Sequence, residues 1–201
     1  MTEHPPSPER NRLTRAEVEE RLARGEQFER ADLHDLDLAG VGLRGRNFRE
    51  SLVYGVQLHS GDPEDERRTD IRETDWTDAA MASAGAETFF GRVNAEGATF
   101  GFVESLVARR NRQTASGKAP DERDSGAYYG FNGAEGNFRN TTWRNIDFGG
   151  GTGYEARFEN ADLTGATFEE CDLTGIDLST ARTDGIRIIN CRTDGLRLPP
   201  G

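Results

Sequence analysis

Apolar or small residues recur at every fifth position from Phe138 to Leu198, and this period constrains the fold more than any other feature. A period of five fits neither an α-helix, which repeats about every 3.6 residues, nor a β-strand, which repeats every second residue. Fixed self-similarity is typical of repeat proteins, whose short units bury apolar residues only against neighbouring units. The first register holds Phe138, Trp143, Phe148, Gly153, Phe158, Leu163, Phe168, Leu173, Leu178, Thr183, Ile188, Thr193 and Leu198, and a second register runs two residues ahead of it.

The run ADLTGATFEECDLTGIDLST at residues 161–180 resembles the pentapeptide-repeat family, whose unit is A(D/N)LXX. The resemblance covers most of the chain. It implies an all-β fold, a right-handed quadrilateral β-helix with four pentapeptides per coil and both registers pointing inward. We expect about seven coils, stacked at the spacing of hydrogen-bonded strands.

Four units per coil would place residues twenty apart above one another, about 4.8 Å apart. This rule predicts one inner column of Phe138, Phe158, Leu178 and Leu198, and another of Phe148, Phe168 and Ile188. On the outside it places Arg182 over Asp162, Arg192 over Asp172, and Arg157, Asp177 and Arg197 in one line. The predicted structural core includes Phe138, Phe148, Phe158, Phe168, Leu173, Leu178, Cys171 and Cys191.

Cys171 and Cys191 are also twenty residues apart, in the second register. Stacked side chains about 4.8 Å apart are distant for a disulfide, whose Cβ atoms lie about 3.8 Å apart. We expect two reduced thiols that fill the core as small apolar groups. A redox pair is the functional alternative.

The chain before the repeats divides into two parts. Residues 1–12 are Pro-rich and charged, and we expect a flexible tail. Residues 13–25 predict a helix, because Thr14 and Glu17 form a capping box and Gly25 provides a stop. This helix would cover the first coil, although a partner-binding helix is an alternative. Residues 26–201 are predicted to form a single β-helix domain.

Two polar interruptions of the period predict loops at about residues 59–69 and 107–126. Long insertions on a rigid scaffold are common binding sites, although a surface excursion without function is the alternative. The charged residues that we regard as candidate partner contacts are Asp62, Glu64, Asp65, Glu66, Arg109, Arg110, Arg112 and Lys118.

No catalytic, cofactor or metal site is expected. His4, His34 and His59 are isolated, and the two cysteines have no histidine partner for zinc. The GGGTG run at residues 149–153 is not followed by the Lys-Ser or Lys-Thr of a phosphate-binding loop. We therefore expect a non-enzymatic binding protein.

The formal net charge is −11. The resemblance implies a topoisomerase-related role, because some members of the family bind DNA gyrase or topoisomerase IV as DNA mimics. Arg182, Arg187, Arg192 and Arg197 surround the last coil and weaken mimicry along the whole rod. Our leading hypothesis is protection of a type II topoisomerase from a poison or toxin through an acidic surface and projecting loops.

The alternative hypothesis is a structural adaptor in a larger assembly such as a secretion or injection apparatus. We expect a cytoplasmic protein that does not bind nucleic acid directly. We also expect no membrane span, because the chain has no long apolar segment. A homodimer through the C-terminal coil is possible in this scheme, although the arginines of two facing ends would repel each other.

Overall fold

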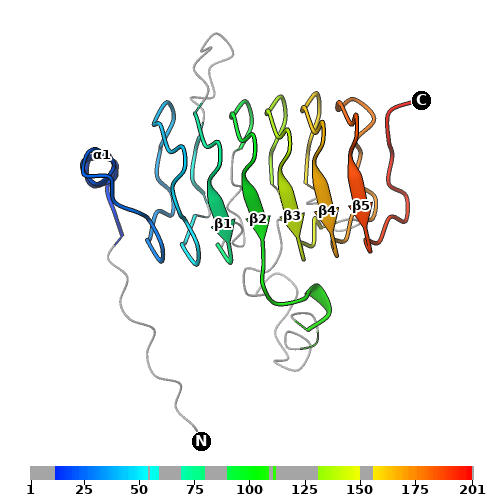
Figure 1. The fold of residues 1–201 in the computed structure, drawn as a ribbon, viewed down its shortest axis with the longest axis horizontal. Helices are drawn as coiled ribbons and strands as arrows, with labels where there is room; N and C mark the ends of the chain where they lie inside the picture. The colour runs from blue at the N-terminus through cyan, green and yellow to red at the C-terminus, as the bar shows by residue number, and fades with distance from the viewer. Residues whose placement is uncertain are drawn as a thin grey trace, which may run out of the picture.

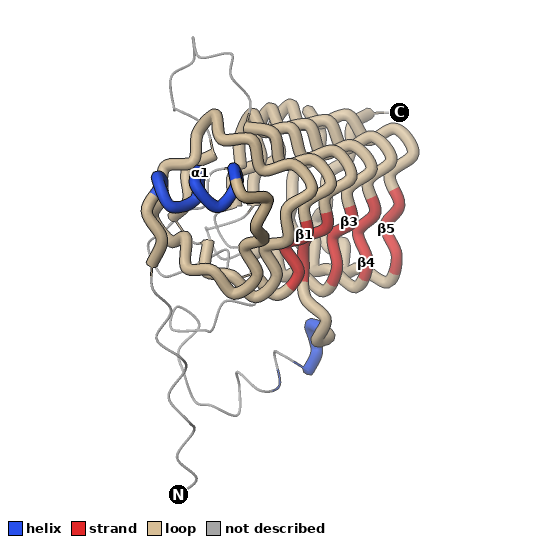
Figure 2. Tube along the Cα trace, turned by 60° about the vertical axis from the view of Figure 1, so that its left-hand side comes forward, coloured by secondary structure: helices blue, strands red, loops and turns tan. Residues whose placement is uncertain are grey.

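The computed structural model describes residues 12–53, 55–58, 69–79, 90–108, 111, 131–149 and 156–200. Most of them form stacked square coils, so the fold is the predicted quadrilateral β-helix (Figures 1 and 2). One side of the coils carries a parallel sheet with the strand order β1-β2-β3-β4-β5. The strands are β1 (Asp75–Thr77), β2 (Thr99–Gly101), β3 (Thr142–Arg144), β4 (Thr167–Glu169) and β5 (Arg187–Ile189).

Each pentapeptide makes one side and one corner of the square. At a typical corner the amide of Ala166 donates to the carbonyl of Leu163 at 2.9 Å, and the residue between them, Gly165, has φ of 71°. A positive φ at this position is the mark of a type II turn. Polar residues such as Glu50 and Asn145 take the same left-handed conformation at other corners. Five residues are therefore one short extended side plus one tight turn, which explains the period.

An aromatic ladder runs along the inner face of the sheet, one ring per coil. Neighbouring rings have centroids 4.1–6.4 Å apart and planes within 12° of parallel. All of the rings are buried. The ladder consists of Phe28, Phe48, Trp76, Phe100, Trp143 and Phe168, and Ile188 continues it on the last coil. These seven positions mark seven coils, as expected.

Each predicted inner column is wrong by one pentapeptide at its first step, whereas the later steps from Phe168 to Ile188 and from Leu178 to Leu198 are confirmed. Trp143, not Phe148, pairs with Phe168, and the amide of Phe138 donates to the carbonyl of Asp162 at 2.8 Å, which places Phe138 beside Leu163. The coil between β3 and β4 has 25 residues instead of 20, since Thr142 pairs with Thr167. An added unit of five residues lengthens the coil without changing the phase of the period, so the sequence pattern does not reveal it. Beyond this point the step returns to 20, from Phe168 to Ile188.

The predicted core side chains lie inside the solenoid. Phe138, Phe148, Phe158, Phe168, Leu173 and Leu178 are fully buried, and Cys171 is nearly so. Cys191 is only partly buried and packs against the edge of the same core.

The first coil is covered by helix α1 (Arg15–Ala23), which lies across the open end (Figure 2). The capping box of Thr14 and Glu17 is present, and Val18 is fully buried. Arg15 also donates to the backbone carbonyls of Asp37 and Ala39, both at 3.0 Å. The apolar face of α1 is therefore used to cap the solenoid.

Three predicted segments, the tail and the two loops, are only partly within the described residues. Residues 1–11, 59–68, 109–110 and 112–130 lie outside them, as does most of the GGGTG run. Thr69 is buried and its hydroxyl donates to the carbonyl of Leu58, so the coil has resumed at Thr69.

Trp143 tests the ladder because it lies between two parallel rings and its indole N–H donates to the hydroxyl of Thr141 at 2.8 Å. We predict that Trp143→Ala lowers the free energy of unfolding by about 3–5 kcal/mol, because it leaves a large cavity. Chemical denaturation followed by circular dichroism would measure it. The control is Arg144→Ala on the outer face, which removes an exposed ion pair with Glu169 and should cost less than about 1 kcal/mol. Equal losses of unfolding free energy in the two variants would contradict a stabilising role for the aromatic ladder.

Candidate protein-binding surface

The charged candidates from the sequence cannot be placed in the structure. Asp62, Glu64, Asp65, Glu66, Arg109, Arg110, Arg112 and Lys118 all lie outside the described residues. The described surface nevertheless shows which parts of the solenoid are already occupied by internal contacts and which are available to a partner.

The C-terminal faces carry ion pairs between coils. Arg182 lies 3.6 Å from Asp162, Arg192 lies 3.3 Å from Asp172, and Arg197 lies 2.8 Å from Asp177, so these predicted pairs are confirmed. Each exposed pair is worth at most about 1 kcal/mol. Their main effect is to neutralise the carboxylates on these faces.

Arg187, the fourth arginine of the last coil, binds a hydroxyl instead of a carboxylate. Two of its guanidinium nitrogens lie 3.1 and 2.9 Å from the Oγ1 atom of Thr167 on the preceding coil. All four arginines of this coil therefore fold back onto the coil before it. A surface arranged in this way does not present a row of free negative charges such as a DNA mimic needs.

Acidic residues of the middle coils are paired in the same way. The guanidinium of Arg72 lies 2.7 Å from a carboxylate oxygen of Asp70, and Arg44 lies 2.8 Å from Glu73. The hydrogen bond from the Arg72 side chain holds the pKa of Asp70 below its usual value, because it stabilises the ionised form. The acidic excess of this part of the chain is thus partly compensated within the solenoid.

The coil stops stacking at the corner after β2, where the chain leaves the solenoid (Figure 1). Gly101 has φ of 128°, and a Cβ atom at this position would lie 2.0 Å from the carbonyl oxygen of Arg144. Only glycine fits so close an approach. The insertion therefore begins near Phe102, about five residues before the predicted start at residue 107, and Gly101 was the signal that our interpretation missed.

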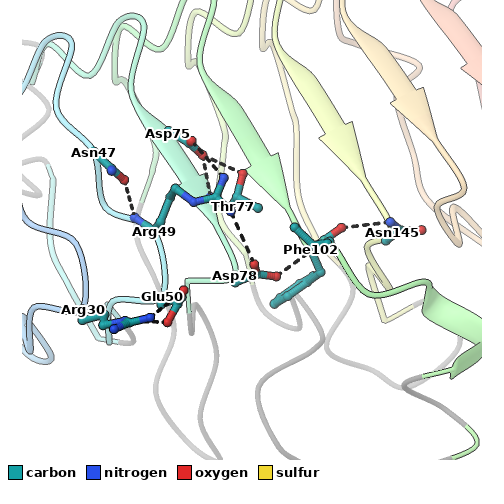
Figure 3. A network of polar contacts seen from close by, with 10 residues as sticks. Arg30, Asn47, Arg49, Glu50, Asp75, Thr77, Asp78, Phe102 and Asn145 are labelled. Atoms are coloured by element: carbon teal, nitrogen blue, oxygen red, sulfur yellow. Dashed lines mark hydrogen bonds and ion pairs between the residues drawn. The ribbon is translucent and has the colours of Figure 1, made fainter.

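We call residues 101–103 together with Asp78 and Asn145 the exit corner (Figure 3). A carboxylate oxygen of Asp78 accepts a hydrogen bond of 2.9 Å from the amide of Val103. The side-chain amide of Asn145 donates to the carbonyl of Phe102, also at 2.9 Å. The exit corner is therefore tied to both neighbouring coils.

Arg49 helps to position Asp78. It lies 3.9 Å from Asp78 and 3.3 Å from Asp75, so its guanidinium bridges the carboxylates at the start of β1 and at the corner that follows it (Figure 3). Asp78 has φ of 60°, a conformation that Asp and Asn tolerate better than most residues. The base of the insertion is held by charge, hydrogen bonds and turn geometry together.

Two apolar side chains are exposed to solvent, one in the exit corner and one in the helical turn that follows it. Val103 and Val107 each have a relative exposure of 69%, whereas the residue before each of them, Phe102 and Leu106, is buried. The hydroxyl of Ser105 accepts a hydrogen bond of 3.2 Å from the amide of Ala108 and caps the helical turn that follows. The segment thus combines a fixed base with exposed apolar groups, the composition that protein interfaces favour at their centre.

One histidine, His34, lies within the described residues. His34 is half-buried and its Nδ1 atom lies 2.5 Å from a carboxylate oxygen of Asp32. Among the described residues no group of three or more His, Cys, Asp or Glu side chains could hold a metal ion. No helix in the same part of the chain is long and apolar enough to cross a membrane.

Comparison with known proteins supports the repeat and the fold. Residues 154–179 match the family model for pentapeptide repeats, with eight copies. The solved structure of HetL, a pentapeptide repeat protein involved in heterocyst differentiation regulation in the cyanobacterium Nostoc sp. strain PCC 7120, is 17% identical with a TM-score of 0.52. The match covers 88% of this chain and 65% of HetL, slightly less than two thirds of that protein.

Two structures of QnrB1, a plasmid-mediated fluoroquinolone resistance protein, are also similar. They are 13% and 12% identical, with TM-scores of 0.45 and 0.46, and cover 81% of this chain and 62% and 64% of QnrB1. A comparison with curated proteins found no match. At these identities the likeness to solved structures shows the fold alone.

The hydrogen bond between Asp78 and the amide of Val103 can be tested by hydrogen exchange. We predict that Asp78→Ala accelerates hydrogen exchange of the Val103 amide by about 5-fold, because a net hydrogen bond is worth about 1 kcal/mol. Asp78→Asn is the matched control: its side-chain oxygen still accepts from Val103 and it tolerates the left-handed conformation. Faster exchange in both variants to the same extent would show that the carboxylate charge, not the hydrogen bond, fixes the segment.

The Asp70–Arg72 pair predicts an acid-dependent loss of stability. Because the pKa of Asp70 is lowered by folding, its contribution is present above the unfolded pKa of about 3.9 and is lost as the pH falls through the lower folded value. Asp70→Asn should therefore destabilise by less than about 1 kcal/mol at pH 6 and by almost nothing near pH 2. Denaturant titrations at the two pH values would measure the difference. The matched variant Arg72→Gln removes the same ion pair from the other side and should show the same loss at pH 6; a loss that persists near pH 2 would contradict this assignment.

Proposed function

Because this chain is a pentapeptide-repeat β-helix, we propose that it works as a non-catalytic binding protein that recognises a protein partner through the exit corner and the insertion that follows it. The observation that carries this proposal is the exposure of Val103 and Val107 on a segment whose base is hydrogen-bonded to both adjacent coils. A partner that covered both valines would gain the hydrophobic contribution without paying to order the base of the segment.

The faces of the solenoid support the same choice. Their charged side chains already pair between coils, so binding there would have to break existing contacts. The predicted basic contacts Arg109, Arg110 and Arg112 lie within the five residues that follow Val107 in the chain. An apolar centre followed by arginines is a common composition of protein interfaces.

The partner that we propose is a type II topoisomerase, DNA gyrase or topoisomerase IV, protected from a poison or toxin in the cytoplasm. The net charge of −11 and the family resemblance favour this class, and the charge also disfavours direct binding to nucleic acid. Protection would depend on the projecting insertions, with Asp62, Glu64, Asp65 and Glu66 as further candidate contacts, and not on DNA mimicry along the rod.

The adaptor hypothesis has less support. It was motivated by the N-terminal helix, but α1 buries Val18 against the first coil and is tied to it by Arg15. A homodimer through the last coil is compatible with the proposal. Ile186, Ile188 and Leu196 are only partly buried there. Three of the four arginines, Arg182, Arg192 and Arg197, are paired with aspartates of the preceding coil, which reduces the expected repulsion.

Supercoiling assays with purified gyrase or topoisomerase IV and a poison would test the partner class. We predict that the protein restores supercoiling, and that Val103→Ser with Val107→Ser raises the concentration required by about 10-fold or more, because two apolar contacts are lost. The control is Ile189→Ser, which removes an exposed apolar side chain from β5 and should leave protection unchanged.

The outcomes distinguish the proposed partner, a type II topoisomerase, from the proposed binding surface, the exit corner. No rescue and no binding to either enzyme would overturn the topoisomerase proposal. Rescue by the double valine variant at the wild-type concentration would keep the partner class and overturn the exit corner as its binding surface.

A further inference from the structure

Two thiols lie at the same inner corner of consecutive coils. Asp172 pairs with Arg192 in parallel register, so Cys171 and Cys191 are stacked neighbours. The amide of Cys171 lies 3.3 Å from the Sγ atom of Cys191, and the amide of Arg192 donates to the carbonyl of Cys171 at 3.0 Å. The sulfur of Cys191 therefore points back toward the coil that carries its partner.

The two thiols differ in exposure and in acidity. Cys171 is 2% exposed, whereas Cys191 is only partly buried at the edge of the core. A hydrogen bond from the Cys171 side chain lowers the pKa of Cys191 to about 7, and burial raises the pKa of Cys171. Near neutral pH much of the pair therefore holds a thiolate on the accessible sulfur and a thiol on the buried one.

The charged groups around Cys191 oppose this acidity only weakly. The carboxylate of Asp172 raises the pKa of Cys191, but the guanidinium of Arg192 lies 3.3 Å from that carboxylate and compensates its charge. The amide of Cys171 adds a fixed dipole directed at the sulfur. Both cysteines are free in the structure.

We propose that Cys191 and Cys171 form a peroxide-sensitive thiol pair that closes into a disulfide between the last two coils. Cys191 is the attacking thiol, because it is the accessible and ionised member, and Cys171 is the resolving thiol. Two cysteines that served only as apolar filler would need neither this difference in burial nor an amide hydrogen bond directed at one of the two sulfurs.

The reaction is balanced with hydrogen peroxide as the oxidant. The Cys191 thiolate attacks one peroxide oxygen, the O–O bond breaks, and a sulfenic acid and hydroxide are formed. The Cys171 sulfur then attacks the sulfenic sulfur, an S–S bond forms, the S–O bond breaks, and the proton of the Cys171 thiol leaves with the hydroxyl group as water. The hydroxide from the first step takes up the proton that Cys191 released on ionisation, so overall two thiols are oxidised and one peroxide is reduced to two molecules of water.

The geometry allows the closure with a small movement. In-register strands have a spacing of about 4.8 Å, within the range of about 4.4–6.8 Å for the Cα atoms of a disulfide. The Cβ atoms must approach to about 3.8 Å, so the last coil has to tilt toward its neighbour at this corner. Residues around Cys191 are partly exposed and can make this adjustment more easily than an inner coil could.

The bond would close a loop of about twenty residues and join the terminal coil covalently to the solenoid. Cross-links of this loop length stabilise mainly by restricting the unfolded chain. We therefore expect oxidation to raise the melting temperature of the full chain by about 5–10 °C, provided that the tilt of the last coil introduces little strain.

Treatment of the purified full chain with a small excess of hydrogen peroxide at pH 7 tests the proposal. We expect free thiols to fall from two to none, the intact mass to fall by two hydrogens, and dithiothreitol to restore both. In Cys171→Ser, Cys191 should accumulate as a sulfenic acid that dimedone traps. In Cys191→Ser, the buried Cys171 should react at least about 10-fold more slowly.

Alkylation by iodoacetamide adds a readout that does not depend on the disulfide. The rate for Cys191 in the wild-type chain should be half-maximal near pH 7, and this midpoint should rise in Cys171→Ala, where the hydrogen bond from the partner thiol is lost. A midpoint unchanged by Cys171→Ala would contradict the coupling of the two thiols. Two free thiols after peroxide, or oxidation of both single variants at equal rates, would overturn the proposal.

Discussion

The structure depends on the in-register stacking of one coil on the next, and the aromatic ladder is its clearest physical expression. A ring can stack on its neighbour only if the coil returns its side chain to the same place, one strand spacing away. Five successive ring pairs do so with planes within 12° of parallel. Because offset stacks add to the area that the rings bury, the ladder favours one register over any shifted alternative.

The same stacking decides where function can lie. Side chains on the outside are also brought above one another, so Arg182, Arg192 and Arg197 meet aspartates of the preceding coil. On faces of this kind the charged side chains already have partners within the solenoid. Partner-accessible groups therefore collect where stacking is interrupted, at the exit corner and at the terminal coil. These are the places where apolar side chains such as Val103 and Leu198 are exposed.

The sequence predicts the repeat and the cap well, because both depend on local patterns. The period of five follows from one turn per side, and the capping box of Thr14 and Glu17 is a contact within four residues. The register across an insertion is a different problem. The coil from Trp143 to Phe168 has five additional residues, and a whole unit leaves the phase unchanged, so only the ring contacts reveal which residues stack.

The candidate site was harder to predict for a related reason. Composition marks the polar middle of an insertion, but the structure shows that the chain departs earlier, at Gly101, for a steric reason. The signal is a single glycine beside a backbone carbonyl of the neighbouring coil, and no sequence pattern places that carbonyl. Likewise, Asp78 and Asn145 support the segment from coils that are distant in the chain. Contacts of this kind depend on which residues of successive coils pair, and the sequence does not show this pairing across an insertion.

The cysteine pair shows how one stacking rule can have different consequences along the solenoid. At an inner coil, two stacked small residues would both be buried and equivalent, and filler would be a sufficient account. At the terminal coil the symmetry is broken, because one member has a coil on each side and the other has a described coil on one side only. Burial then raises the pKa of Cys171, while the hydrogen bond between the thiols lowers that of Cys191. The asymmetry that would make the pair reactive is therefore a result of position in the stack and needs no additional catalytic group.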